Sequence, residues 1–343
     1  MYKEIITKVT TRQELSEEEI FALIHAIRYD EISDVQIAGF QVALLMKGAS
    51  LEEIAAIARA MRENCVPLQP KVDAELMDTC GTGGGLSTFN ISTATALVAA
   101  AAGIPIAKHG SRSISSLSGS ADVLEALGVN IDLTPAQAEA LIEEIGISFI
   151  YAPLFHPVMC KVLPPETELG IKTIFYTIIG PLINPAFAPR HLLGVYKPEL
   201  LDTVTYVARS LGYTRAMFVH GVDGLDEISL LGTTKINELI DGKVKKYEIC
   251  PEDFGLHRCT LDEIRTGTPK ENAETITGVF SGRIAGPRKD AIVLNAAGAL
   301  VVGGKAQDFT QGVALARGLI ESGAAQAKLD ALRTHSNAFK PRV

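Results

Sequence analysis

Residues 78–95, DTCGTGGGLSTFNISTAT, contain four glycines within five positions, at 81, 83, 84 and 85. Glycine tolerates positive φ and has no Cβ to hold a ligand away, so its backbone N–H groups can surround an anion. Hydroxyl side chains follow, and the small residues at 94–102 predict a helix after the loop. A glycine loop that leads into a helix N-terminus favours phosphate or pyrophosphate. The alternative interpretation of this cluster is a tight turn without a ligand.

The composition around this loop indicates a soluble globular protein. The chain has 343 residues, of which 47% are hydrophobic and 21% charged, enough for two domains. A net charge of −8 and a pI near 5.5 argue against bulk binding to nucleic acid or to an anionic membrane. The five cysteines show no CxxC spacing, which indicates reduced thiols in the cytoplasm. We expect no signal peptide, and the apolar run 94–107 is too short to span a bilayer.

Residues 1–70 are predicted to form only helices. Ser16, Ser33 and Ser50 each precede a Glu or Gln by three positions, which is the spacing of a capping box before an apolar-periodic run. We expect helices at about 16–27, 34–47 and 51–64, and a further one at 2–10. The next segment, 66–71, contains two prolines and is predicted to be a linker.

From residue 74 onward, short apolar segments alternate with helical patterns. We expect strands at 75–79, 104–107, 148–151 and 216–220. One helix is expected to begin at Thr134-Pro135, where proline occupies the first helical position. Three further helices are expected at 199–211, 291–303 and 309–322. This alternation predicts an α/β domain with a largely parallel sheet. A proline-rich stretch at 161–189 interrupts it.

Two loops that follow predicted strands carry charged side chains. Residues 108–120, KHGSRSISSLSGS, suit a second phosphate contact or a flap, and the alternative is a solvated loop. Asp226 and Glu227 end the segment HGVDGLDE, and carboxylates with water and substrate phosphates are typical Mg²⁺ ligands. The alternative for this pair is a charged turn. His156, which precedes a proline, is either a pocket residue or a structural histidine.

Together these segments resemble one family, the anthranilate phosphoribosyltransferases. The shared motifs, in the family's order, are GTGG, TFNIST, KHG, SGSAD, APLFHP, GPL with NP, and HGVDGLDE. The resemblance extends over about residues 3–335 and implies the fold of the pyrimidine nucleoside phosphorylases. It implies a helical domain, 1–70 completed by about 161–189, and a larger α/β domain, 74–160 with 190–343. The family is usually homodimeric through the helical domain.

The resemblance implies transfer of a phosphoribosyl group from 5-phosphoribosyl-1-diphosphate to the nitrogen of anthranilate, with release of pyrophosphate, in tryptophan biosynthesis. The transition state gathers positive charge on the ribose and negative charge on the diphosphate, so fixed N–H groups, cations and Mg²⁺ would stabilise it. The implied catalytic residues are Lys108 and Ser92. The implied donor-binding residues are Gly81, Thr82, Gly83, Gly84, Asn90, Ser92, Thr93, Lys108 and Ser120. The implied Mg²⁺ ligands are Ser92, Asp226 and Glu227. The implied acceptor-binding residues are His109, Ser111, His156 and Glu166.

The chain departs from the family pattern at four of its positions. Gly85 replaces the aspartate of GTGGD, and Ser111 replaces the asparagine of KHGNRS. Glu166 stands where the family carries an arginine that pairs with the anthranilate carboxylate, and Tyr176 follows TIF in place of asparagine. An arginine–carboxylate pair is a directed contact, so Glu166 reverses the charge of a recognition site.

Two explanations of this charge reversal stay open at the level of sequence. In the first explanation, another cation, such as Lys161, Lys172 or Arg112, substitutes for the arginine, and anthranilate remains the acceptor. Alternatively, the same donor chemistry serves a different aromatic or heterocyclic acceptor. Other functions are a nucleoside phosphorylase and a non-catalytic ligand- or nucleic-acid-binding homologue. Lys108 and the Asp226–Glu227 pair argue against the non-catalytic homologue.

Overall fold

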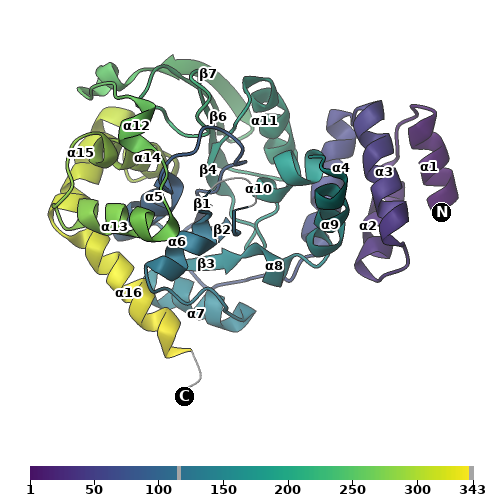
Figure 1. Ribbon diagram of the computed structural model, residues 1–343, viewed down its shortest axis with the longest axis horizontal. Helices are drawn as coiled ribbons and strands as arrows, with labels where there is room; N and C mark the ends of the chain where they lie inside the picture. Colours follow the sequence, from purple (N-terminus) through teal and green to yellow (C-terminus); the bar gives the residue numbers. More distant parts are fainter. Residues whose placement is uncertain (114–116, 340–343) are drawn as a thin grey trace.

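A seven-stranded sheet forms the centre of the molecule (Figure 1), which is described here from a computed structural model covering residues 1–113 and 117–339. The spatial order of the strands is β3-β2-β1-β4-β5-β6-β7. The pairs from β3 to β5 are parallel, whereas β6 and β7 are added antiparallel. The strands are β1 Met77–Asp78, β2 Ile106–Gly110, β3 Ile147–Tyr151, β4 Arg190–Gly194, β5 Arg215–Gly221, β6 Thr234–Ile240 and β7 Lys243–Ile249. The prediction of a largely parallel sheet in an α/β domain is confirmed.

Four helices form the N-terminal domain, which lies at one end of the sheet (Figure 1). They are α1 Tyr2–Thr10, α2 Glu17–Arg28, α3 Asp34–Lys47 and α4 Leu51–Glu63. All three predicted capping boxes form, since Ser16, Ser33 and Ser50 each accept a hydrogen bond from the backbone three positions later. These helices therefore begin where the sequence predicts.

The helices of the α/β domain cover both faces of the sheet. They are α5 Ile91–Ala101, α6 Ser120–Ala126, α7 Pro135–Ile145, α11 Leu201–Ser210, α12 Leu261–Ile264, α13 Pro269–Phe280, α14 Pro287–Val302, α15 Phe309–Glu321 and α16 Ala324–Ala338, with 3₁₀ turns at Pro198–Leu200 and Pro251–Phe254. The helix predicted at 199–211 thus starts with a 3₁₀ turn. No helix within residues 1–113 and 117–339 is both long and apolar enough to cross a bilayer.

The proline-rich stretch 161–189 is largely helical, as the family resemblance implies, although its prolines predict an interruption. It follows α8 Ala152–Phe155 and contains most of α9 Met159–Leu169, a π-helical turn Phe175–Ile179 and α10 Gly180–Leu182. Helix α9 continues through Pro164 and Pro165. Figure 1 shows α9 beside α3, so this stretch returns to the N-terminal helices.

Two hydrophobic cores meet at the sheet. Met217 and Val219 of β5 face a core with α5, α7 and α14–α16, whereas Phe218 faces a second core with α11. This alternation is the period of two that a strand buried on both faces requires. The second core continues into α1–α4 and includes Val162 and the π-helical turn. The domain division of 1–70 with 161–189 and 74–160 with 190–343 stays a prediction, which this shared core supports.

The Glu53 carboxylate joins three parts of the helical domain. It accepts hydrogen bonds from the backbone of Leu15 and of Ser50, both at 2.9 Å, and pairs with Lys47 at 2.6 Å. The side chains of Lys47 and Glu53 are only 5% and 1% exposed. Removing one partner of such a pair leaves a buried charge without compensation.

We therefore expect Glu53→Ala to lower the free energy of unfolding by about 3 kcal/mol. The matched control is Glu17→Ala, which removes a carboxylate that is 51% exposed and pairs with Arg59, and it should cost less than about 1 kcal/mol. Urea denaturation measures both. Equal losses would contradict the role given to Glu53.

Candidate active site

A cavity of about 450 Å³ opens at the carboxyl ends of the central strands. After β1 the chain builds β2 and β3 on one side, and β4 and β5 lie on the other, so the topology reverses between β1 and β4. Ligands of open α/β sheets bind at such a reversal. The glycine loop follows β1 at this point, and Gly194 ends β4 opposite it.

The glycine loop is held against the end of β4. Both the backbone N–H and the hydroxyl of Thr82 donate to the Gly194 carbonyl, at 2.9 and 3.2 Å. Gly83 and Gly84 have φ of +62° and +88°, which a side chain would strain. A Cβ on Gly81 would lie 3.1 Å from the Gly194 carbonyl oxygen. The predicted donor residues Gly81, Thr82, Gly83 and Gly84 all line the cavity.

Gly85 packs closely against the loop that carries Gly224 and Asp226. A Cβ at this position would lie 2.8 Å from both an Asp226 carboxylate oxygen and the Gly224 carbonyl. The Asp226 carboxylate therefore occupies the space beside the loop that a side chain at position 85 would need. Because Gly85 replaces the aspartate of GTGGD, the carboxylate beside the glycine loop is that of Asp226 alone.

The N-terminus of α5 supplies hydroxyl and amide groups to the same cavity. Asn90, Ser92 and Thr95 line it, but Thr93 does not: its side chain is buried in the protein interior. The placement of Thr93 in the diphosphate cradle is therefore not supported by its position. The Asn90 side chain is fixed, since it donates to the Ser118 carbonyl at 3.1 Å and accepts from Asn272 at 2.9 Å.

Asp226 and Glu227 reach the cavity from the loop after β5 and remain partly accessible. Desolvation first, and then the charge of Asp226, raise the pKa of Glu227 to about 8, while Lys108 opposes this shift. Desolvation also raises the pKa of Asp226. Two adjacent carboxylates in such surroundings fit a divalent cation, whose charge would hold both in the ionised form. Hard oxygen ligands of this kind suit Mg²⁺.

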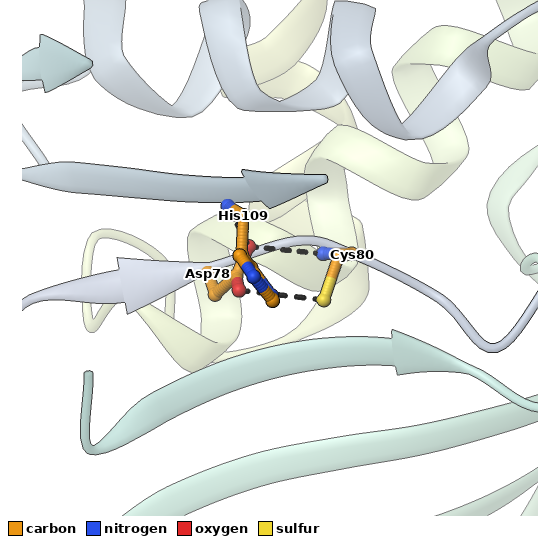
Figure 2. Close-up of side chains that lie close together, drawn as sticks. All are labelled: Asp78, Cys80 and His109. Atoms are coloured by element: carbon orange, nitrogen blue, oxygen red, sulfur yellow. Dashed lines mark hydrogen bonds between the residues drawn. The ribbon is translucent and has the colours of Figure 1, made fainter. Parts of the chain in front are cut away.

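Asp78, Cys80 and His109 form a second cluster of possible metal ligands (Figure 2), and their ligand atoms lie within 4.8 Å of one another. The carboxylate of Asp78 is already occupied by hydrogen bonds. It accepts from the backbone of Thr79, Cys80 and His109, and from the amide of Asn184 at 2.7 Å. Burial raises the pKa of Cys80 well above its usual value, so the thiol stays protonated and donates to Asp78. We therefore assign this cluster a structural role.

A pair of buried histidines also lines the cavity. His109 of β2 and His156 after α8 are joined through their Nε2 atoms at 3.1 Å. Burial lowers the pKa of His109 to about 4 and that of His156 well below its usual value. One ring therefore donates and the other accepts, with neither charged. Ser111 and Ser120 line the cavity as well.

Comparison with known proteins gives consistent matches over the whole chain. Residues 3–65 match the helical bundle domain, and residues 73–326 the a/b domain, of a glycosyl transferase family. The chain is 46% identical over 340 residues to anthranilate phosphoribosyltransferase of Acetivibrio thermocellus, covering 99% of this chain and 98% of the relative. It is 47% identical over 333 residues to that of Desulfosudis oleivorans, covering 97% and 98%.

The chain belongs to the anthranilate phosphoribosyltransferase family. The crystal structure of that enzyme from Thermus thermophilus matches with a TM-score of 0.90 and 41% identity, covering 97% of this chain and 99% of the other. The Saccharomyces cerevisiae enzyme in complex with PRPP and Mg also matches with a TM-score of 0.90, at 28% identity and 98% coverage of both chains. The fold prediction and the recognition of the family are confirmed.

Glu166, predicted to border the acceptor, is a second site residue, after Thr93, that does not lie where the sequence predicts. It does not line the cavity, and its side chain is buried between α9 and α3. The carboxylate accepts hydrogen bonds from Gln41 at 3.1 Å and from both the backbone and the hydroxyl of Thr173. These donors turn Glu166 away from the acceptor side, so its charge does not oppose an anionic acceptor there.

Sequence reasoning left three side chains of the site without a role: Tyr176, which lines the cavity, and Asn184 and Asn272, which hold other site residues. Of the three cations considered as substitutes for the arginine, Lys172 and Arg112 line the cavity and Lys161 does not. Asn184 was quoted within a family motif, but nothing in the motif shows that its amide binds Asp78. Asn272 lies 182 positions from Asn90, so only the folded chain reveals this contact.

The histidine pair predicts a defined pH dependence of stability. Unfolded histidine has a pKa near 6.5, whereas burial lowers the pKa of His109 to about 4. Below pH 6.5 the unfolded chain therefore takes up a proton that the native chain does not, and stability is lost as the pH falls to about 4. We expect His109 alone to account for about 3 kcal/mol of this loss.

Measuring the free energy of unfolding between pH 7 and pH 4 tests this dependence, with values near neutrality as the reference. His109→Gln should reduce the loss, and the exposed His25→Gln serves as the matched control. An unchanged slope in His109→Gln would show that this histidine is not held neutral by burial.

Proposed function

We propose that this protein transfers the phosphoribosyl group of 5-phosphoribosyl-1-diphosphate to the amino nitrogen of anthranilate and releases pyrophosphate. The observation that carries the proposal is that a single cavity holds the glycine loop, the Asp226–Glu227 pair and the neutral histidines. The relatives with this name match nearly the full chain. A yeast relative was solved in complex with PRPP and Mg, and again with 4-fluoroanthranilate.

The reaction breaks the bond between the ribose anomeric carbon and the diphosphate oxygen and forms a bond from that carbon to nitrogen. We assign the diphosphate to the backbone of Gly81–Gly84 and to Asn90 and Ser92 at the start of α5, where N–H groups and the helix dipole favour an anion. Lys108 is 3% exposed and projects from β2 beside this loop, so its charge acts in a water-poor site.

Asp226, Glu227 and the hydroxyl of Ser92 are the groups we assign to Mg²⁺. Bound there, the ion would neutralise charge that develops on the departing pyrophosphate. The nucleophile is a neutral aromatic amine, and the nitrogen becomes strongly acidic once it bonds to carbon. The uncharged His109–His156 pair lies on the acceptor side as a hydrogen-bonding surface, and the reaction requires no strong base.

The direct test is loss of anthranilate fluorescence in the presence of the ribosyl donor and Mg²⁺. We expect turnover that EDTA abolishes, and Glu227→Gln should reduce kcat/KM by about 100-fold, because one metal ligand is lost. Glu248→Gln on the exposed edge strand β7 is the matched control. Absence of anthranilate consumption would contradict the proposal, and ribose 1-phosphate released from nucleosides would indicate a phosphorylase instead.

We also propose that the protein is a homodimer and works in the cytoplasm. Val35, Val42 and Met46 share one face of α3, and Val35 and Met46 are 82% and 72% exposed. An exposed apolar stripe of this kind is typical of an interaction surface. All five cysteines are free thiols, which suits a reducing compartment.

Sedimentation analysis tests the dimer. Wild type should sediment as two chains, and Val42→Lys with Met46→Lys should sediment as one, because two buried charges would oppose association. Leu86→Lys, an exposed apolar residue of the glycine loop, is the control for added charge. A wild-type monomer, or an unchanged dimer in the double variant, would contradict this interface.

A further inference from the structure

Three cationic side chains line the described part of the cavity: Lys108, Arg112 and Lys172. An acceptor with a carboxylate, such as anthranilate, requires one of them if its charge is to be compensated. The three differ in whether they are already neutralised by protein anions. This difference decides which one is available to the acceptor.

Arg112 is fully engaged by protein carboxylates. Its guanidinium forms a bidentate pair with Glu125, at 2.5 and 2.9 Å, and contacts Asp122 at 3.0 Å. Its charged end also lies 5.7 Å from the centre of the Tyr151 ring. An acceptor carboxylate would therefore have to displace two existing ion pairs.

Lys108 belongs to the donor side of the cavity. Its ammonium lies 3.4 Å from the Thr79 hydroxyl, at the start of the glycine loop. Its charge acts on Asp78 and Glu227, since it lowers the pKa of both. Lys161, a further candidate at the level of sequence, does not line the cavity and pairs with Asp30 at 2.5 Å.

Lys172 is exposed and has no carboxylate partner among residues 1–113 and 117–339. Its ammonium contacts the Tyr176 ring, whose centre lies 4.9 Å away. An aromatic face attracts a cation without neutralising its charge. Lys172 is thus held at the cavity wall with its hydrogen-bonding capacity intact.

Three local features fix the position of Lys172. Gly170, with φ +67°, ends α9, and Glu166 binds the backbone and hydroxyl of Thr173, which closes the turn that carries Lys172. The π-helical turn Phe175–Ile179 follows directly. Phe175 and Ile178 of this turn enter the core of the helical domain, while Tyr176 faces the cavity. Short π-helical segments of this kind occur frequently at functional sites.

We propose that Lys172 binds the carboxylate of the acceptor, that Tyr176 orients its ammonium, and that Glu166 is a positioning residue that holds the turn between them. This inference rests on the proposed function and goes beyond it by naming the residues that select an anionic aromatic amine. The glutamate at position 166 then supports recognition of a carboxylate indirectly, although its own charge has the opposite sign to an arginine.

Comparing anthranilate with anthranilamide, a neutral acceptor of the same shape, tests the assignment. Lys172→Met should lower kcat/KM for anthranilate by about tenfold to about 100-fold, the loss of one charge-assisted hydrogen bond. The value for anthranilamide and the KM for the ribosyl donor should stay unchanged. Lys172→Arg should retain the preference, and Lys161→Met is the matched control for a lost lysine.

Glu166→Ala tests the positioning role. We expect it to raise the KM for anthranilate without changing the KM for the ribosyl donor or the use of anthranilamide, since only the turn that presents Lys172 is released. Thermal unfolding of each variant shows whether a loss of activity reflects a loss of folded protein. An increase in both acceptor KM values would contradict a specific effect on the carboxylate.

The outcomes separate this inference from the proposed function. If wild type uses anthranilate and Lys172→Met keeps the wild-type ratio of anthranilate to anthranilamide, the inference is wrong and the proposed function stands. If wild type does not use anthranilate at all, the proposed function fails and the inference fails with it. A ratio that collapses only in the Lys172→Met variant supports both.

Discussion

The buried carboxylate of Asp78 is the contact on which the two halves of the site depend. It ends β1, a strand of two residues, and joins the start of the glycine loop to the backbone of His109 on β2 and to Asn184 after α10. Burial alone would raise the pKa of this group, but His191, Lys108, His109 and the Asn184 amide outweigh it and lower the pKa. The donor loop and the acceptor histidine are thus fixed relative to each other by one anion.

The proposed arrangement places the binding groups for the anionic diphosphate and those for the neutral amine in one cavity of about 450 Å³. On one side, backbone N–H groups, Lys108 and a carboxylate pair suited to Mg²⁺ face the position assigned to the diphosphate. On the proposed acceptor side, the histidines are kept neutral by burial and Lys172 would supply the available positive charge. Such pre-arranged charges need no reorganisation during the reaction, which is the main source of electrostatic catalysis. Gly85 belongs to this arrangement, because a side chain at this position would crowd the Asp226 carboxylate as it is placed here.

Local signals in the sequence were sufficient for much of the fold, whereas the donor-binding residues were expected from the family resemblance. The capped helices begin at Ser16, Ser33 and Ser50 because capping depends on residues three positions apart. The hairpin β6–β7 was missed although its turn, Asp241-Gly242, carries a recognised signal. Glu166 was misplaced for a different reason: its direction is set by Gln41, 125 positions away, and by Thr173. Sequence alignment places a residue along the chain but does not determine which way its side chain points.

The most direct test is a crystal structure with 5-phosphoribosyl-1-diphosphate, Mg²⁺ and 4-fluoroanthranilate bound together. The account predicts the diphosphate on the glycine loop, the metal at Asp226 and Glu227, and the amine about 3.5 Å from the anomeric carbon. The acceptor carboxylate should lie within hydrogen-bonding distance of the Lys172 ammonium. A diphosphate bound away from Gly81–Gly84, or an acceptor whose carboxylate contacts another cation, would contradict it.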